Sequence, residues 1–173
     1  MTDNHWNEYG AYVAYKNIME SFSKEFPELL PVDISDFIIE SRETKGKNLT
    51  NLLGIPDGVT EQEINLKPKF NRIAIEGKKS NYQPPSYFPY KDSYEQIYET
   101  KNVEQLKLLV IQDSFGATLI PFLSEHFNKS VYIFDAWQHA FNEDIVLKEK
   151  PDIYLQLVVE SLLPNIAKSS KRP

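Results

Sequence analysis

The serine with the clearest chemical potential in this chain follows a short apolar stretch. Residues 108–111 are Leu-Leu-Val-Ile, and Gln112, Asp113 and Ser114 come next. Such a run is typical of a buried strand, and the apolar residues after Ser114 recur at the three- and four-residue spacing of a helix. Ser114 is therefore predicted to lie in a strand-to-helix turn at the carboxyl end of a sheet, where open α/β folds bind their ligands.

Two roles fit a serine in such a turn. As a nucleophile, Ser114 would have the first backbone N–H groups of the helix beside it, those of Ser114, Phe115 and Gly116, which suit a developing oxyanion. As a structural residue, Ser114 or its neighbour Asp113 would only cap the helix, because both residue types are preferred at that position. The turn by itself favours the cap, so the nucleophile hypothesis needs a base from elsewhere in the chain.

A candidate base and a carboxylate to orient it occur together near the amino terminus. Asp3 lies two residues before His5, in a loop that leads into a predicted amphipathic helix from about residue 8 to 26. Burial of this helix is expected to fix the position of His5. A histidine oriented by an aspartate activates serine in many hydrolases, so Ser114, His5 and Asp3 form a candidate triad.

A second acid and base pair competes with the first. Asp135 and His139 follow another predicted buried strand, residues 130–135, and can reach the same sheet edge as Ser114. Spacing alone does not choose between the two pairs. The remaining histidine, His126, is interpreted as structural, because a cation near the end of the helix after Ser114 would complement the helix dipole.

Two sequence segments together resemble a known family. Residues 3–7 read Asp-Asn-His-Trp-Asn, and residues 113–116 read Asp-Ser-Phe-Gly. This pair of motifs, in this order, resembles the DHHW family of SGNH-hydrolase-like domains, which includes the alginate O-acetylation proteins of bacterial polysaccharide export. Further similar segments are residues 48–54, 119–127, 150–154 and 159–160.

The resemblance implies roles for the candidate residues and an activity. By it, Ser114 is the nucleophile, His5 the general base and Asp3 its partner, in preference to Asp135 and His139. It implies O-acetylation of a cell-surface or exported polysaccharide, with the acetyl group supplied by a donor protein or small molecule. Three alternatives stay open: a carbohydrate esterase that passes the acetyl group to water, a catalytically silent carbohydrate-binding domain, and a scaffold subunit.

The sequence departs from the usual SGNH pattern after its last predicted strand. Glu160 and Ser161 stand where an asparagine of the oxyanion hole is expected, so the third oxyanion donor is unassigned. Glu160 is predicted to lie at the same sheet edge as Ser114, where it either lines the site or pairs with a cation. Trp6 is interpreted as a packing anchor for the His5 loop rather than a platform for a sugar ring.

Composition narrows the range of ligands. The formal net charge of -6 argues against a nucleic-acid partner and favours a neutral glycan, unless a local basic patch overrides the sum. The three histidines lack metal-ligand spacing and no phosphate-binding loop is present, so neither a metal nor a cofactor is predicted. Residues 81–90 hold three prolines and four aromatic residues. These rings either stack on sugars or pack on the core.

The order of predicted elements defines the expected fold. Alternating strands and helices predict an α/β three-layer domain with a mainly parallel sheet over residues 1–167, followed by a disordered tail at 168–173. The family resemblance implies that this domain is SGNH-hydrolase-like. Because Asp3 stands so near the start, we expect the carboxyl-terminal part of a longer protein. No segment resembles a membrane span or a signal peptide. The expected location is extracytoplasmic, with the signal or anchor upstream, or cytoplasmic if the chain is complete.

Overall fold

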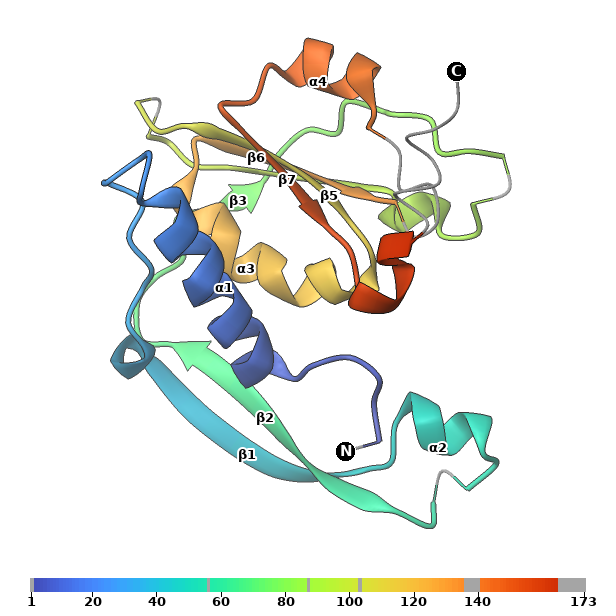
Figure 1. Ribbon diagram of the computed structural model, residues 1–173. Coiled ribbons are helices and arrows are strands. Elements are labelled where there is room, and N and C mark those ends of the chain that lie inside the picture. Colours follow the sequence, from blue (N-terminus) through green and yellow to red (C-terminus); the bar gives the residue numbers. More distant parts are fainter. Residues whose placement is uncertain (1, 56, 87, 103, 136–140, 165–173) are drawn as a thin grey trace. The chain divides into compact units, whose positions relative to one another are not determined.

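The protein is described by a computed structural model that covers residues 2–55, 57–86, 88–102, 104–135 and 141–164. The chain divides into two compact units, Met1–Arg72 and Ile73–Pro173, whereas the sequence was treated as one domain over 1–167. Figure 1 labels their helices and strands. Within the described ranges, no helix is both long and apolar enough to cross a bilayer. The predicted tail at 168–173 lies outside the described residues.

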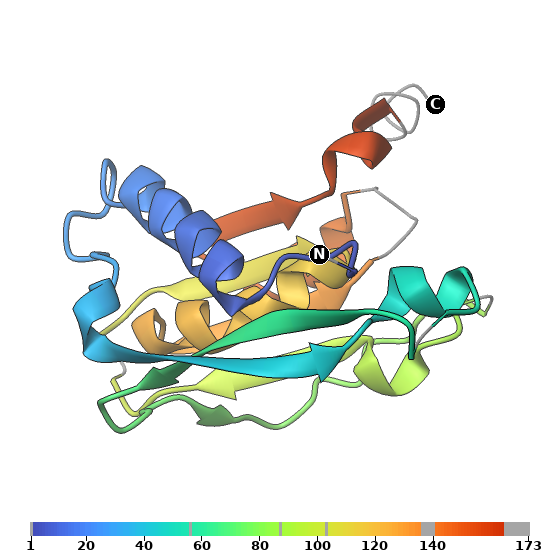
Figure 2. The same cartoon turned by 90° about the horizontal axis from the view of Figure 1, so that it is seen from below.

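The first unit consists of a helix and a long β-hairpin (Figures 1 and 2). Helix α1 spans Glu8–Phe22 and is capped by the Asn7 side chain, which accepts the Gly10 N–H at 2.9 Å. Strands β1 (Phe37–Lys45) and β2 (Thr60–Pro68) pair antiparallel over their full length. The helix predicted for residues 8–26 is thus confirmed, although it ends four residues early, where the chain turns ahead of Pro27.

The sequence did not predict this hairpin. Strand β1 runs to Lys45 and strand β2 begins at Thr60, so both pass through the polar residues 42–45 and 61–63. A two-stranded ribbon has little core, so its strands lack an alternating apolar pattern. Cross-strand charge pairs replace it: Arg42 contacts Glu63 at 2.5 Å.

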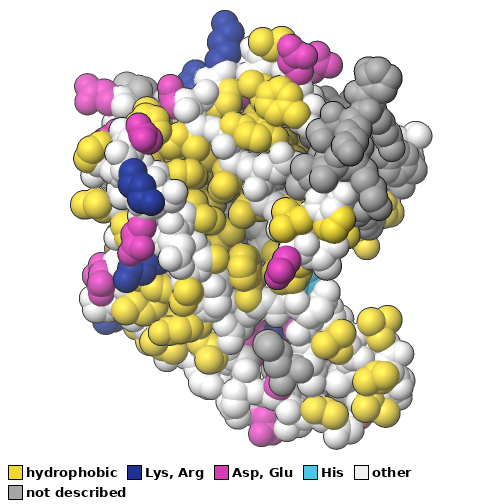
Figure 3. Space-filling model, in the orientation of Figure 1, with side chains coloured by type: hydrophobic (Ala, Val, Ile, Leu, Met, Phe, Trp, Pro, Cys, Tyr) yellow, Lys and Arg dark blue, Asp and Glu magenta, His cyan; other side chains and the backbone are white. Residues whose placement is uncertain are grey.

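Helix α2 (Asn48–Leu52) lies in the connection between the two strands. Gly54 follows it with φ of +71°, the left-handed conformation that glycine adopts most readily at the end of a helix. Figure 3 shows hydrophobic side chains on the surface of this segment. The exposed ones are Leu49, Leu52, Leu53 and Ile55.

The second unit is built on a mixed five-stranded sheet in the order β3-β4-β6-β5-β7. Its strands are β3 (Ile75–Glu76), β4 (Glu95–Glu99), β5 (Lys107–Gln112), β6 (Lys129–Phe134) and β7 (Ile153–Leu157). Strand β5 is parallel to β6 and β7, but β4 is antiparallel to β3 and β6.

The expected mainly parallel sheet is therefore a mixed one. Helical crossovers connect β5 to β6 and β6 to β7, as parallel strands require, whereas a loop without a crossover helix connects β3 to β4. Strand β4 is rich in polar residues. The alternation of buried Glu95 and Ile97 with half-buried Gln96 and Tyr98 marks a strand, but its polar residues hid the pattern.

Helices α3 (Ile120–Leu123) and α4 (Glu143–Glu149) cover opposite faces of this sheet (Figure 1). On one face, Ile145 of α4 packs in a cluster with Leu109 and Ile111. On the other, the hydroxyls of Ser124 and Tyr132 are 2.9 Å apart. Strand β5 is buried on both faces, which confirms the prediction from its apolar run.

The segment after Ser114 is helical but not one continuous α-helix. It begins as the 3-10 helix η3 (Ser114–Leu119), continues as α3 and ends as the 3-10 helix η4 (Ser124–His126). Pro121 lies in the first turn of α3, where its missing N–H costs nothing; deeper in a longer α-helix it would remove a hydrogen bond.

His126, predicted to act as a cation on the helix dipole, is instead a neutral side chain. Burial lowers the pKa of His126 to about 4, because the charged ring would lose its hydration. The dipole interpretation was therefore wrong for neutral pH. Since the helix there is a single 3-10 turn, its dipole is also too short to offset that loss.

We expect His126 to make the protein sensitive to mild acid. The unfolded chain takes up a proton near pH 6.5 and the folded chain only near 4, so stability is complete above pH 6.5 and falls between these values, by up to about 3 kcal/mol. Urea unfolding at several pH values should show this loss in the wild type and a smaller one in His126→Asn. Parallel curves for the two proteins would contradict the assignment.

Candidate active site

The turn that carries Ser114 is closed by Asp113. The Asp113 carboxylate accepts the Phe115 N–H at 2.9 Å, and its backbone oxygen accepts the Gly116 N–H at 3.1 Å. Asp113 is buried, with 4% of its surface exposed, while Ser114 is exposed. The helix cap is thus Asp113, and capping does not explain the serine.

The same contacts bear on the predicted oxyanion donors. Of the three N–H groups proposed for that role, those of Phe115 and Gly116 are bonded to Asp113 in this structure. Sequence spacing placed all three groups at the turn, but only the structure shows the capping bonds.

Asp113 also connects the turn to the end of the last strand. Its second carboxylate oxygen accepts the N–H of Val159 at 2.6 Å. Glu160, the next residue, is exposed and begins the 3-10 helix η5 (Glu160–Leu162). The predicted position of Glu160, at the sheet edge that carries Ser114, is confirmed. The sequence had suggested only a capping role for Asp113, whereas the structure shows that it also binds the end of β7.

Gly116 is required by the close packing of this turn on β5. A Cβ at residue 116 would lie 2.6 Å from Cβ of Gln112, well inside contact distance. Gln112 is 3% exposed, and its side-chain oxygen is a buried atom without a hydrogen-bond partner among the described residues. The amide therefore packs against the glycine backbone, and the turn cannot move outward without exposing it.

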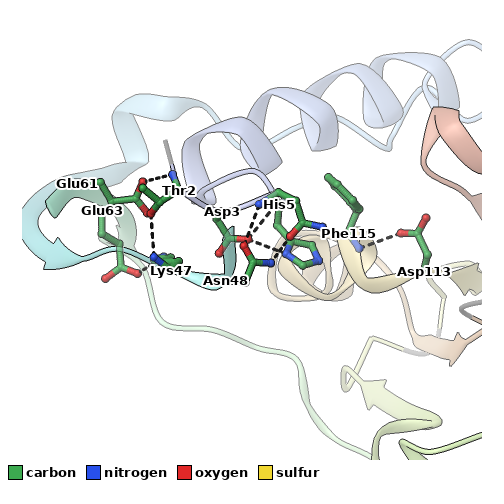
Figure 4. A network of polar contacts seen from close by, with 10 residues as sticks. Thr2, Asp3, His5, Lys47, Asn48, Glu61, Glu63, Asp113 and Phe115 are labelled. Carbon is green, nitrogen blue, oxygen red and sulfur yellow. Dashed lines mark hydrogen bonds and ion pairs between the residues drawn. The ribbon is translucent and has the colours of Figure 1, made fainter. Parts of the chain in front are cut away.

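Asp3 and His5 form a direct pair in the first unit (Figure 4). Nδ1 of His5 is 2.9 Å from Oδ1 of Asp3, and the same oxygen accepts the backbone N–H of His5 at 3.0 Å. About 30% of the His5 side chain and 26% of the Asp3 side chain are exposed. With its proton on Nδ1, the ring keeps the lone pair on Nε2, the atom that would act as a base.

The surroundings keep Asp3 ionised. Partial burial by itself would raise the pKa of Asp3, but hydrogen bonds from the backbone and ring of His5, and the charges of His5 and Lys47, lower it overall. A carboxylate that stays charged orients the imidazole and stabilises the imidazolium that forms when His5 accepts a proton.

The position of the His5 loop depends on hydrogen bonds as well as on helix burial. Thr2 N–H donates to Glu61 at 2.6 Å, and the backbone N–H of Lys47 donates to the Thr2 hydroxyl at 2.8 Å. Asn4 bonds to Asn48. Sequence reasoning missed these supports; its one signal was the resemblance of residues 48–54 to a family segment.

Trp6 follows His5 and is half-buried. A Cβ on Gly10 would lie 2.9 Å from Cβ of Trp6, so the base of the tryptophan side chain packs closely on the first turn of α1. This close contact agrees with its interpretation as a packing anchor.

The predicted site residues fall into two groups. Asp3, His5 and Trp6 belong to the first unit, while Ser114 and Glu160 belong to the second. In the first unit Asp3 and His5 are paired, and in the second unit Ser114 and Glu160 follow the neighbouring parallel strands β5 and β7.

The competing pair is described only in part. Asp135 follows β6, is 7% exposed, and donates its N–H to the backbone oxygen of Gln112 at 2.7 Å. It lines a cavity of about 350 Å³ together with Ile111 and Phe141. Asp135 thus lies at the predicted sheet edge, but His139 is outside the described residues.

The proline-rich segment at 81–90 packs mainly on the core. Phe88 is 1% exposed, and the Tyr82 hydroxyl donates to Glu149 at 2.5 Å. Tyr90 is 53% exposed and stacks on Phe134. Of the two sequence hypotheses, core packing is confirmed for Phe88 and Tyr82, whereas Tyr90 presents a face to solvent.

Among the described residues, no group of three or more His, Cys, Asp or Glu side chains is arranged so that it could hold a metal ion.

The fold is similar to that of several solved structures. PatB1 of Bacillus cereus is 19% identical with a TM-score of 0.64, over 94% of this chain and 62% of that one. A DHHW family protein from Eubacterium siraeum DSM 15702 is 18% identical with a TM-score of 0.61, over 90% and 57%. Bacillus cereus PatB1 with a sulfonyl adduct is 18% identical with a TM-score of 0.61, over 93% and 60%.

These similarities concern the fold. They support the resemblance to the DHHW family at that level, and this chain spans about 60% of the length of the three solved chains. No family model matches the sequence, and no curated protein does.

Gly116→Ala should destabilise the Ser114 turn. The added methyl group would collide with Gln112, so we expect the free energy of unfolding to fall by about 1–3 kcal/mol, the usual effect of overpacking. Urea unfolding measures this loss. Ala117→Ser, at the next, exposed position, is the matched control and should stay within about 0.5 kcal/mol of the wild type. Equal stability of the two variants would contradict the packing argument.

Proposed function

We propose that this chain catalyses acyl transfer, most simply of an acetyl group, from a donor to a glycan hydroxyl. Ser114 is the nucleophile, His5 the general base and Asp3 the residue that orients His5. The observation that carries the proposal is the Asp3–His5 pair, in which the carboxylate meets Nδ1 at 2.9 Å and directs the basic Nε2 outward from the pair.

The Ser114 turn supports the nucleophile role. Ser114 is an exposed serine directly after a buried strand, and the turn is capped by Asp113, so the cap does not require the serine hydroxyl. A sulfonyl adduct is present in one of the similar structures, and sulfonyl groups are captured by activated nucleophiles. Resemblance of the two motifs to the DHHW family agrees with O-acetyl transfer.

The proposed reaction has two half-steps. Nε2 of His5 takes the hydroxyl proton as Ser114 Oγ bonds to the acyl carbon, and the same proton then passes to the departing donor group. In the second half-step, His5 takes a proton from the acceptor hydroxyl, whose oxygen bonds to the acyl carbon. The Ser114 ester bond breaks and Oγ recovers the proton. For both steps His5 must come within hydrogen-bond reach of Ser114.

The oxyanion would be stabilised first by the N–H of Ser114. A second donor would come from Phe115 or Gly116 if its bond to Asp113 lengthens during the reaction. Glu160 lies at the same edge and is proposed to contact the acceptor, since carboxylates accept hydrogen bonds from sugar hydroxyls.

The net charge of -6 favours a neutral acceptor such as a cell-surface or exported glycan. The family resemblance favours action outside the cytoplasm, and the narrower likeness to alginate O-acetylation proteins is one form of this proposal.

The nucleophile is tested by intact mass spectrometry after incubation with p-nitrophenyl acetate. We expect an acetyl adduct on the wild type that maps to Ser114, and none on Ser114→Ala. Ser93→Ala, at another exposed serine of the second unit, should label as the wild type does. Labelling of Ser114→Ala to the same extent would rule out this nucleophile.

The base is tested by the rate of that labelling. His5→Ala and Asp3→Asn should each slow it by about 10³-fold or more, because one loses the base and the other its orientation. Unchanged rates in both variants would exclude this pair and direct attention to Asp135 and His139.

Transfer is separated from hydrolysis by an acceptor assay with a neutral oligosaccharide. New ester on the sugar supports the transferase, while free acetate alone supports an esterase.

A further inference from the structure

The loop that carries Asp3 and His5 is held by the start of α2. Thr2 and Asn4, the residues on either side of Asp3, both bond to residues 47–49, which lie far away in the sequence. Figure 4 labels Thr2, Asp3, His5, Lys47 and Asn48 of this network, which all belong to the first unit.

Thr2 is the first point of attachment. Its hydroxyl accepts the Lys47 N–H at 2.8 Å and its backbone oxygen accepts the Leu49 N–H at 2.9 Å. Helix α2 has no side-chain cap of its own, so Thr2 provides acceptors for N–H groups at its start. Thr2 is 8% exposed, and the contact therefore fixes the loop and the helix together.

Asn48 is the second point of attachment and acts through its side chain. Its Oδ1 accepts the backbone N–H of Asn4 at 3.2 Å, and its Nδ2 donates to Oδ1 of Asn4. Both polar groups of this amide are thus directed at the one residue between Asp3 and His5. A rotation of the Asn4 backbone would misalign the carboxylate and the imidazole at once.

The support itself is firmly placed. Thr50 is 4% exposed, and its hydroxyl donates to the backbone oxygen of Lys47 at 2.7 Å. A Cβ at Gly46 would lie 2.8 Å from the Thr50 methyl carbon, so the chain before α2 packs directly on this side chain. The ammonium of Lys47 contacts Glu63 of β2 at 2.6 Å. The start of α2 is therefore tied to strand β2 of the hairpin through this ion pair.

We propose that Asn48 is a positioning residue for His5, acting through Asn4, in the reaction proposed above. The inference rests on that proposed function. Asn48 touches neither Asp3 nor His5 through these bonds; it fixes the peptide between them, so that Asp3 meets Nδ1 and Nε2 keeps the lone pair for Ser114. Loss of this support should affect the rate of the chemical step more than substrate binding, because general-base geometry tolerates little displacement.

The test compares three variants of α2. Asn48→Ala removes both bonds to Asn4. Asn48→Asp keeps the acceptor for the Asn4 N–H and loses the donor. Asn51→Ala is the matched control, at an exposed position three residues further along the same helix.

The kinetic readout is kcat and KM for p-nitrophenyl acetate, measured beside the thermal midpoint. We expect kcat of Asn48→Ala to fall by about tenfold to a hundredfold with KM changed less than about twofold. Asn48→Asp should lie between Asn48→Ala and the wild type, and Asn51→Ala should match the wild type.

The spectroscopic readout is the nitrogen NMR spectrum of the His5 ring, assigned with His5→Ala. We expect the Nδ1–H form to dominate in the wild type and in Asn51→Ala, and a mixture of ring forms in Asn48→Ala, because the ring then loses its fixed partner. A folded Asn48→Ala with an unchanged ring spectrum and unchanged kcat would overturn the proposal. A lower thermal midpoint with an unchanged ring spectrum would show a merely structural role and would also overturn it.

The two readouts separate this inference from the proposed function. If the wild type neither labels at Ser114 nor turns over ester, the proposed function fails, and the ring spectra still decide whether Asn48 positions His5. If Asn48→Ala does not fold, Asn48→Asp and the reciprocal variant Asn4→Ala, which removes the acceptor for Nδ2, provide the same comparison of ring spectra.

Discussion

The candidate site in the second unit depends on the hydrogen bonds that the carboxylate of Asp113 accepts. One of its oxygens closes the turn after β5 and the other accepts the N–H that follows β7. A buried carboxylate is costly unless hydrogen bonds compensate for lost hydration, and two backbone donors do so here. Because the two donors come from different segments, the one carboxylate fixes both segments, and Ser114 lies in sequence between Asp113 and the first donor, Phe115.

The same physical device recurs elsewhere in the second unit. Glu95 is 4% exposed and accepts the backbone N–H groups of Ser80 and Tyr82 through its two oxygens. Glu149 accepts the Tyr82 hydroxyl and contacts Lys129 at 2.6 Å. The proline-rich segment has little regular structure, so its backbone N–H groups need partners from outside, and buried carboxylates supply them.

In the first unit, hydrogen bonds from distant residues likewise fix a loop, the shorter one that carries Asp3 and His5. Asp3 and His5 are only two residues apart, and their pairing is local, but the residues around them are held by α2 and β2. A loop fixed at both flanks loses little further entropy when its side chains adopt one geometry. This arrangement suits a site in which an acid and a base must be aligned before substrate arrives.

The sequence by itself determined the local features. The apolar run of β5 and the spacing of α1 predicted a strand and a helix, because burial imposes periods that a sequence displays. The pairing of Asp3 with His5 was also predictable, since residues two apart in a loop lie within reach of each other. The position of Ser114 in a strand-to-helix turn followed from the same reasoning.

The tertiary structure decided whatever depends on residues distant in sequence. The hairpin of β1 and β2 was missed because its charged residues pair across strands rather than bury an apolar face. The mixed sheet, the neutral state of His126 and the bonds of Asn48 could not be predicted from the sequence either. Each is fixed by which distant groups surround a residue, and no local period in the sequence records that.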